Sequence, residues 1–444
     1  MQRTSYSYKE IWKVAYPILL TLLVQNLIQV INTAFLGRVG EVELGASAIA
    51  GIFYIAMFTI AFGFSTGSQI LIGRRNGEKN YDKIGEIVIW GIVFLWGIAL
   101  LIFLFTRMFS ESILEKVLSS KNVLDASVEY LNWRIFGLFF STANVMFRAF
   151  FVGITRTKVL TINAILMALV NVAFDYLLIF GNWGFPQMGI AGAAIASVIA
   201  EAVSVLFFIA YVFGTINLKK YGFSLSFRKQ VGVIKSTLNV SLSLMIQYFL
   251  SLSTWLIFFL AIERMGETSL AVSNIIRSFY MIVGIPIFAL AATANTLVSN
   301  TIGAGKQEEV ISLIWKIGRF TLLIVSAFIL FAGFFPTLSL SIYTTDTNLI
   351  AQSIPSLYVI LAVLPAMALG NVFFSSISGT GNTRSALYIE LSVLLLYGFW
   401  IWFTAVHLHA SLAVCWTVEM IYALFIWLFS FIYFKRGKWM NKKI

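Results

Sequence analysis

Residues 38–41 read Arg38-Val39-Gly40-Glu41, and the pattern returns 226 positions later as Arg264-Met265-Gly266-Glu267. Three identities keep the same spacing: Gly77 with Gly303, Gly153 with Gly379, and Thr157 with Thr383. A repeat that covers half of a 444-residue chain indicates two homologous halves. In a strongly apolar chain, such a duplication is typical of secondary transporters, whose substrate site lies where the repeats face each other.

The composition predicts an all-α integral membrane protein. Hydrophobic residues make up 59% of the chain and charged residues only 11%, whereas soluble chains carry roughly 25% charged residues. Apolar runs of about 20 residues, the length that a bilayer requires, occur twelve times. The predicted spans are 11–36, 44–72, 84–106, 125–152, 159–181 and 189–213, then 234–262, 270–299, 311–333, 348–378, 385–407 and 411–434. We expect two six-helix lobes, 1–216 and 231–444, joined by a cytoplasmic linker at 217–230.

The basic residues predict the orientation, because Lys and Arg accumulate in cytoplasmic loops. With the N-terminus inside, the cytoplasmic segments carry 23 Lys and Arg residues and the opposite side carries five. Both termini are therefore expected in the cytoplasm. The net charge of +12 follows from this topology, and nucleic acid is not an expected partner. The first apolar stretch is too long for a signal peptide, so we expect it to remain as a span.

No motif indicates an enzyme or a bound cofactor. Cys415 is the single cysteine, and His407 and His409 are the only histidines, placed on different faces of a helix. The chain contains no GxxxxGK[ST] phosphate-binding loop. Gly63 and Gly67 form a GxxxG pattern that favours close helix packing. Energy for transport is thus expected from a gradient of H⁺ or Na⁺.

Two matching polar stripes lie on the first span of each half. Their members are three or four residues apart: Gln25, Gln29 and Asn32, and then Ser243, Gln247, Ser251 and Thr254. Because this spacing places side chains on one helix face, we interpret the stripes as two walls of a substrate cavity. The alternative is that these groups only join helices through hydrogen bonds.

Asn171 and Asp175 lie one helical turn apart near the middle of the fifth span. An acid at that depth is costly unless it is protonated or binds a cation. The carboxylate and amide oxygens suit Na⁺, and the carboxylate alone suits H⁺. The alternative is a structural acid satisfied by a hydrogen bond or by Arg148.

Three other acids are expected to be embedded in the membrane, away from the ends of the predicted spans. Glu201 lies in the same half as Asp175, so we assign it with Arg148 to the substrate cavity, with placement near the membrane interface as the alternative. Glu390 and Glu419 are weaker candidates, because neither has a second acid one helical turn away.

Five segments resemble the MATE (multidrug and toxic compound extrusion) family, and the resemblance covers essentially the whole chain. They are residues 32–40 (NTAFLGRVG), 69–73 (QILIG) leading to Gly77, 153–158 (GITRTK), 171–175 (NVAFD) and 192–197 (GAAIAS). Each segment alone is weakly specific. Their order and their placement on the predicted helices are what resemble this family of the MOP flippase superfamily.

The resemblance implies an exporter of amphipathic, often cationic, small organic molecules in the plasma (inner) membrane, driven by H⁺ or Na⁺ antiport. A monomer is the default expectation, because two lobes joined by one linker need no partner. Asp175 and Asn171 match the ion site of the family's N-lobe, and Ser197 stands where a hydroxyl often contributes. Pro17 matches a proline around which the first helix bends. Membrane lipid is the other expected partner.

Asn32 departs from the family pattern, because related chains usually carry an Asp at this position of the first span. One acid then remains in the N-lobe site, and one H⁺ or Na⁺ per cycle is the simplest hypothesis. The C-lobe acids that some members of the family use, in the seventh and tenth spans, have no counterpart, since residues 243–260 and 348–378 contain no Asp or Glu. Coupling is therefore expected at Asp175.

Two rival functions stay open at this point. A flippase of lipid-linked saccharides would need cations for a pyrophosphate, and Arg134, Arg148 and Arg277 lie inside predicted spans. A membrane enzyme is the other rival, but the chain shows no nucleophile and base or metal-ligand pattern.

Overall fold

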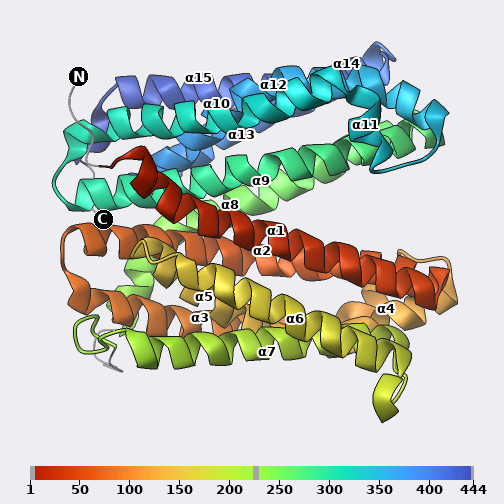
Figure 1. Cartoon of the computed structure of the whole chain (residues 1–444), viewed down its shortest axis with the longest axis horizontal. Coiled ribbons are helices and arrows are strands. Elements are labelled where there is room, and N and C mark those ends of the chain that lie inside the picture. The colour runs from red at the N-terminus through yellow and green to blue at the C-terminus, as the bar shows by residue number, and fades with distance from the viewer. Residues whose placement is uncertain (1–5, 224–229, 442–444) are drawn as a thin grey trace. The chain divides into compact units, whose positions relative to one another are not determined.

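The computed structural model describes residues 6–223 and 230–441, and these residues are almost entirely helical (Figure 1). The helices of the first half are α1 (Tyr8–Val39), α2 (Glu41–Gly77), α3 (Ile84–Glu115), α4 (Lys121–Arg134), α5 (Gly137–Gly153), α6 (Lys158–Phe180) and α7 (Gly189–Thr215). Those of the second half are α8 (Gln230–Glu263), α9 (Glu267–Gly303), α10 (Val310–Phe334), α11 (Pro336–Ser341), α12 (Thr347–Gly379), α13 (Thr383–Ile401), α14 (Leu412–Trp416) and α15 (Val418–Lys435). A π-helical turn, η4 (Trp402–His407), extends α13.

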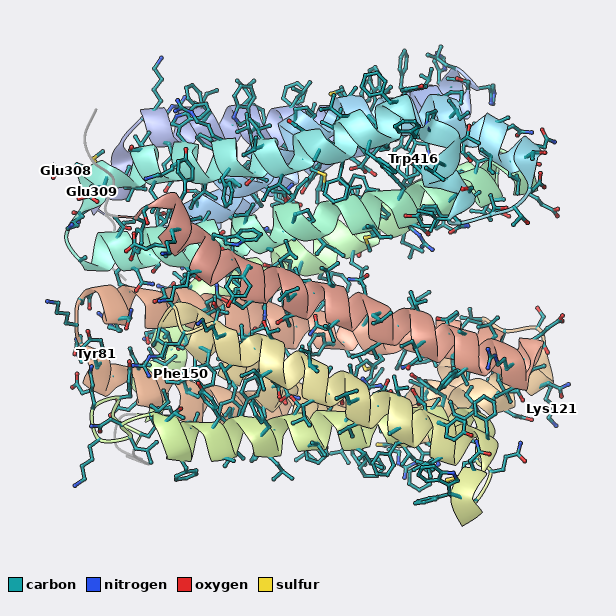
Figure 2. The ribbon with its side chains drawn as sticks, in the orientation of Figure 1. Tyr81, Lys121, Phe150, Glu308, Glu309 and Trp416 are labelled. Atoms are coloured by element: carbon teal, nitrogen blue, oxygen red, sulfur yellow. The ribbon has the colours of Figure 1, made fainter. Side chains whose placement is uncertain are left out.

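The described residues form eleven helices long and apolar enough to cross a membrane, or twelve when α4 and α5 count as one broken span. This agrees with the twelve predicted spans. Figure 2 shows labelled charged side chains such as Lys121, Glu308 and Glu309 near helix ends, where they stay outside the hydrocarbon.

The predicted fourth span, 125–152, is interrupted in the structure. α4 and α5 meet at an angle of 52° at residues 135–136. Arg134 ends α4 and binds Glu201 of α7. Gly137 begins α5, and a Cβ atom there would clash with both of these side chains. The run of apolar residues gave no sign of this break, because the partner of Arg134 comes from another helix.

Two compact units divide the chain. Unit 2 comprises Leu20–Met245, and unit 1 comprises Met1–Leu19 with Ile246–Ile444. The boundaries fall inside α1 and α8, so the first part of each helix belongs to one unit and the remainder to the other. The predicted lobes, 1–216 and 231–444, follow the sequence repeat instead and stay a prediction. Of the predicted linker, residues 224–229 lie outside the described part of the chain.

In unit 2, α2 packs closely against the first part of α8. Cβ atoms added at Gly63 and Gly67 would lie 2.6 Å from the Met245 Cα and 2.7 Å from the Ser241 Cα. The Ser241 hydroxyl donates to the carbonyl of Phe64 at 3.1 Å. The interpretation of Gly63 and Gly67 as packing residues is therefore confirmed.

The sequence repeat corresponds to repeated packing within each unit. Gly153 of α5 lies against the carbonyl of Gln69 on α2, with 3.2 Å to an added Cβ atom. Gly379 of α12 lies against the carbonyl of Asn295 on α9, with 2.5 Å to an added Cβ atom. Both pairs are related by the 226-residue shift, because Gln69 corresponds to Asn295.

Both described ends of the chain lie at one end of unit 1. The Lys316 ammonium group of α10 donates to the carbonyl of Tyr6 at 2.7 Å. Nearby on the same helix, Trp315 contacts Phe373 of α12 at 5.0 Å between ring centroids. Phe373 in turn lies 6.2 Å from Phe434, which packs on Trp439 at 5.5 Å. An even number of spans requires such a common side, and its assignment to the cytoplasm stays a prediction.

We expect Gly67→Ala to destabilise the protein, because the added methyl group would force α2 and α8 apart. Overpacking of this kind costs about 1–3 kcal/mol. The thermal midpoint in detergent, followed by size-exclusion chromatography with fluorescence detection, measures the loss. Gly97→Ala on α3 is the matched control, since nothing lies within 4 Å of its added Cβ atom. Equal midpoints for the two variants would contradict this packing.

Removing one partner of the Arg134–Glu201 pair should be worse than removing both. Glu201→Gln leaves a buried guanidinium without a counter-charge, which costs about 3–5 kcal/mol of unfolding free energy. The double variant Arg134→Met with Glu201→Leu should recover much of this loss, because apolar side chains of similar size are tolerated there. The same thermal midpoint measures both. A double variant less stable than Glu201→Gln would show that the pair has another stabilising role.

Candidate functional site

The α6 helix carries the acid that the sequence singles out. Asn171 and Asp175 are spaced one turn apart, and their exposed fractions are 2% and 0%. α1 brings Asn32 to the same place. Its amide nitrogen, facing the two side chains, donates to Asp175 Oδ2 at 2.8 Å and to Asn171 Oδ1 at 2.9 Å. An amide from one helix thus holds the acid and the amide of another.

Ser197 of α7 completes a polar group that we call the Asp175 cluster: Asn32, Asn171, Asp175 and Ser197. The Asn171 amide donates to the Ser197 hydroxyl at 3.4 Å. Asp175 Oδ1 is buried and has no hydrogen-bond partner among the described residues. The structure therefore brings together the four residues that we assigned to ion coupling, and their role stays a prediction. One free carboxylate oxygen among neutral polar groups suits a proton or a hard cation.

The sequence reasoning missed Tyr130 of α4. This residue packs beside a small core of unit 2 that includes Leu36 of α1 and Ile179 of α6. It therefore lies next to the two helices that carry Asn32 and Asp175, one turn before Arg134 on α4. Its one sequence signal is the spacing of four residues before Arg134.

Glu201 and Arg134 form a bidentate ion pair in unit 2. The two guanidinium nitrogens donate to the carboxylate at 2.9 and 2.6 Å, and the side chains are 12% and 13% exposed. The guanidinium also lies 3.9 Å from the ring centroid of Tyr54. Each charge is thus neutralised by the other, and Glu201 is held by Arg134 rather than offered to a ligand.

A chain of amides and hydroxyls extends from this pair across α5, α6 and α7. The Asn144 amide donates to the carbonyl of Glu201 at 3.1 Å. Ser204 donates to Asn144 Oδ1 at 2.8 Å, and Asn163 donates to Ser204 at 2.8 Å. These bonds satisfy polar groups that would otherwise be costly inside the membrane.

The remaining predicted cavity residues fall into two groups, one in each unit. In unit 2, Gln25 and Gln29 are exposed on α1, and the Arg148 guanidinium lies 5.4 Å from the ring centroid of Phe62. In unit 1, Gln247 is buried on α8, and Ser251 is 2.6 Å from a carboxylate oxygen of Glu390. Glu390 is thus a partner that the sequence reasoning missed.

Pro17 lies inside α1, and the helix continues through it. Proline has no backbone N–H, so one hydrogen bond of the helix is missing there. The boundary between the units follows after Leu19. Pro17 is therefore near the point where α1 leaves unit 1.

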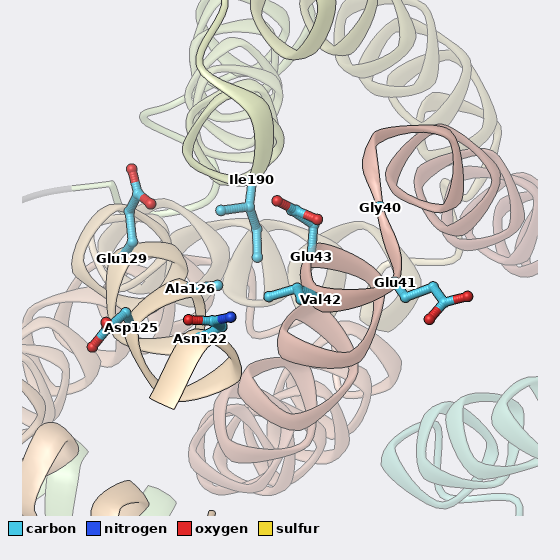
Figure 3. Close-up of a pocket in the computed structure, with 9 residues that line it drawn as sticks. All are labelled: Gly40, Glu41, Val42, Glu43, Asn122, Asp125, Ala126, Glu129 and Ile190. Atoms are coloured by element: carbon cyan, nitrogen blue, oxygen red, sulfur yellow. The ribbon is translucent and has the colours of Figure 1, made fainter. Parts of the chain in front are cut away.

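An acidic pocket of about 620 Å³ opens at one end of unit 2 (Figure 3). Its carboxylates come from the start of α2 and from α4: Glu41, Glu43, Asp125 and Glu129. Within the described ranges, no group of three or more His, Cys, Asp or Glu side chains is arranged to hold a metal ion. The pocket instead provides a diffuse negative field that attracts cations.

The family model of MatE matches residues 17–177 and 241–402, one segment in each half of the chain. The chain is 23% identical over 440 residues to a "Probable multidrug resistance protein NorM" of Thermotoga maritima, covering 98% of this chain and 94% of that protein. It is 25% identical over 299 residues to a protein of the same name from Agrobacterium fabrum, covering 66% of this chain and 63% of that protein.

A solved structure of a MOP superfamily transporter from Pyrococcus furiosus has the same fold. It superposes with a TM-score of 0.88 at 17% sequence identity and covers 98% of this chain and 97% of that chain. The family consists of transporters, so the prediction that the protein is not an enzyme is confirmed. The predicted location as a multi-pass protein of the plasma membrane is confirmed as well. The chain belongs to the MatE family of membrane transporters, as its sequence resemblance predicts.

Proposed function

We propose that the protein exports amphipathic small organic molecules across the plasma membrane by antiport against H⁺ or Na⁺. The observation that carries this proposal is Asp175, which is fully buried in the membrane-spanning helix α6 and has a carboxylate oxygen without a hydrogen-bond partner among the described residues. The multidrug resistance names of the relatives support the class of substrate. Asp175 supports the coupling.

Within the described residues, the Asp175 carboxylate forms no ion pair with Lys or Arg. Asn32 donates to it, but an amide carries no net charge. The negative charge of an ionised carboxylate in hydrocarbon therefore remains uncompensated, and binding of H⁺ or Na⁺ stabilises it strongly. The bound ion neutralises the acid, and the acid becomes ionised again when the ion leaves.

Asn32 gives the site a property that a second aspartate would lack. Its carboxamide can present the nitrogen to an ionised Asp175, or rotate and present the oxygen to a bound cation or to a protonated Asp175. The same side chain thus serves the empty and the loaded state. One acid and one adaptable amide correspond to one ion per cycle at this site.

Transport requires that the ion bind one conformation better than the other. α1 supplies a connection for this purpose, since it carries Asn32 in unit 2 and Pro17 in unit 1. A change in the hydrogen bonds of Asn32 is transmitted along one helix to its weakest point at Pro17. In this proposal, α1 bends there as the Asp175 cluster loads and releases its ion.

The proposed ligand is cationic and amphipathic, and the protein acts as a monomer. Gln25 and Gln29 offer amide groups along the exposed face of α1, among apolar neighbours such as Leu27. The acidic pocket of Figure 3 lies beyond the end of α1, on the side that the predicted topology places outside, where it attracts the coupling cation. The amide groups of α1 and their apolar neighbours support an amphipathic ligand.

A flippase for anionic lipids has less support. Arg134 is already engaged by both oxygens of Glu201, so it is unavailable for a bidentate contact to phosphate. The Arg277 guanidinium lies 5.0 Å from the ring centroid of Phe259 in unit 1. The arrangement of charges favours export of cations.

We expect Asp175→Asn to abolish gradient-driven transport without unfolding the protein, because an amide neither binds a proton nor neutralises a cation. The measurement is ethidium uptake into inside-out proteoliposomes under an imposed H⁺ or Na⁺ gradient. Uptake should fall to the level of liposomes without protein, because no ion can then be exchanged at this site. The ion whose gradient drives the wild type identifies the coupling ion.

Glu78→Gln is the matched control, since it removes a carboxylate that pairs with Arg75 beyond the end of α2. This variant should transport like the wild type. Size-exclusion profiles establish that each variant is folded. Full activity of Asp175→Asn would exclude Asp175 as the coupling acid.

A further inference from the structure

Two glutamates of unit 1 are buried as deeply as Asp175 and have no part in the function proposed above. Glu390 lies on α13 and Glu419 on α15, with exposed fractions of 0% and 2%. They lie in helices long and apolar enough to cross a membrane. Acids at such positions are rare in membrane proteins and usually serve function.

Hydroxyl groups from two other helices contact Glu390. The Ser251 hydroxyl of α8 lies 2.6 Å from Glu390 Oε1. The Tyr422 hydroxyl of α15 lies 3.0 Å from Oε1 and 3.1 Å from Oε2. These direct contacts leave no gap for a metal ion between the oxygens, but they suit a proton.

Glu419 has a matching arrangement. Tyr280 of α9 donates to Glu419 Oε2 at 3.0 Å, and Tyr397 of α13 donates to Oε1 at 3.0 Å. The contacts between α13 and α15 are thus reciprocal. Tyr422 of α15 binds Glu390 of α13, and Tyr397 of α13 binds Glu419 of α15. The rings of Tyr397 and Tyr422 lie 6.1 Å apart, so the two halves of this arrangement touch.

No counter-charge faces this group among the residues that the structure describes. α12 packs against α13 and α15 but has no charged residue, and its Tyr358 bonds to the carbonyl of Gly333. On α9, the Arg277 guanidinium lies over Phe259. On η4, the His407 ring stacks on Trp402. Two ionised carboxylates would therefore place two uncompensated negative charges in hydrocarbon.

Ser251 allows Glu390 to gain and lose a proton without losing a hydrogen bond. Its hydroxyl lies 3.0 Å from the carbonyl of Gln247 as well as 2.6 Å from Glu390. When Glu390 is ionised, Ser251 donates to it. When Glu390 is protonated, the carboxyl donates to Ser251, whose own hydrogen turns to the Gln247 carbonyl. Both protonation states are satisfied in the same geometry.

The Gln247 side chain adds an independent sign of an incompletely satisfied site. It lies one turn before Ser251 on the same face of α8, is 6% exposed, and its Oε1 has no partner in the described part of the chain. A buried acceptor without a donor is costly. A water molecule that enters during proton exchange would donate a hydrogen bond to this oxygen.

We propose that Glu390 and Glu419 form a second proton-binding site, located in unit 1 and separate from the Asp175 cluster of unit 2. One proton binds at Glu390 Oε1, where an O–H bond forms as the Ser251 hydroxyl turns away. Glu419, held by two phenols, carries the negative charge. The inference rests on the proposed antiport and deepens it, because each half of the chain then binds an ion and two ions move per cycle.

Infrared spectroscopy tests the site without relying on transport. The full-length protein with Asp175→Asn, purified in detergent, should show the C=O band of a protonated carboxylic acid at neutral pH. Adding Glu390→Gln should remove this band, whereas adding Glu78→Gln should leave it. A band that is unchanged by Glu390→Gln, or absent beforehand, would overturn the proposal.

Tyr422→Phe and Ser251→Ala separate a proton site from a merely structural contact. Each removes one hydroxyl that satisfies an ionised Glu390, so the band should persist to higher pH in both variants. An unchanged titration would contradict the assigned hydrogen bonds. Thermal midpoints measured on the same samples establish that the variants are folded.

A transport measurement then gives the consequence for coupling. Glu390→Gln should exchange one proton fewer than the wild type for each ethidium ion in proteoliposomes, whether Asp175 binds H⁺ or Na⁺. The same number of protons in both would overturn the second site even if the Asp175 mechanism holds. A wild type without gradient-driven uptake would instead contradict the proposed function, while the infrared result still decides whether Glu390 holds a proton.

Discussion

Hydrocarbon cannot solvate a charge, and the surroundings of the buried acids in the described helices follow from that constraint. Three buried groups of acidic side chains are stabilised in three different ways. Glu201 is neutralised by Arg134 through two short hydrogen bonds. Asp175 is held by amides, and Glu390 by hydroxyl groups. Only the first of these cancels the charge within the protein itself.

The difference separates structural from exchangeable acids. A bidentate ion pair is fully satisfied and would lose much stability if either partner changed its charge, so Arg134 and Glu201 suit the fixed bend between α4 and α5. Amide and hydroxyl dipoles stabilise an anion without cancelling it. Such a site binds H⁺ or Na⁺ when one is supplied and releases it when the surroundings change, as coupling requires.

The sequence predicted those features that depend only on the spacing of residues within one helix. The apolar runs predicted the spans, and the spacing of four residues placed Asn171 and Asp175 on one face of α6. Asn32 and Ser197 were assigned through family resemblance, since nothing in their own helices indicates Asp175 as a neighbour. The break after Arg134 was missed because Glu201 is 67 residues away. Glu390 was ranked low because its own helix has no second acid, whereas its partners come from α8 and α15.

The internal repeat explains why such partners differ between the halves. Duplication preserved backbone packing, as the equivalent contacts of Gly153 and Gly379 demonstrate. It did not preserve the acids: the positions of Asn171 and Asp175 correspond to Tyr397 and Ile401 on α13. Tyr397 nevertheless binds a carboxylate, that of Glu419 from α15. The equivalent helices α6 and α13 therefore both contact a buried acid. α6 carries its acid itself, whereas α13 contacts Glu419 of the neighbouring helix α15. Tyrosine hydroxyl groups donate hydrogen bonds to that carboxylate.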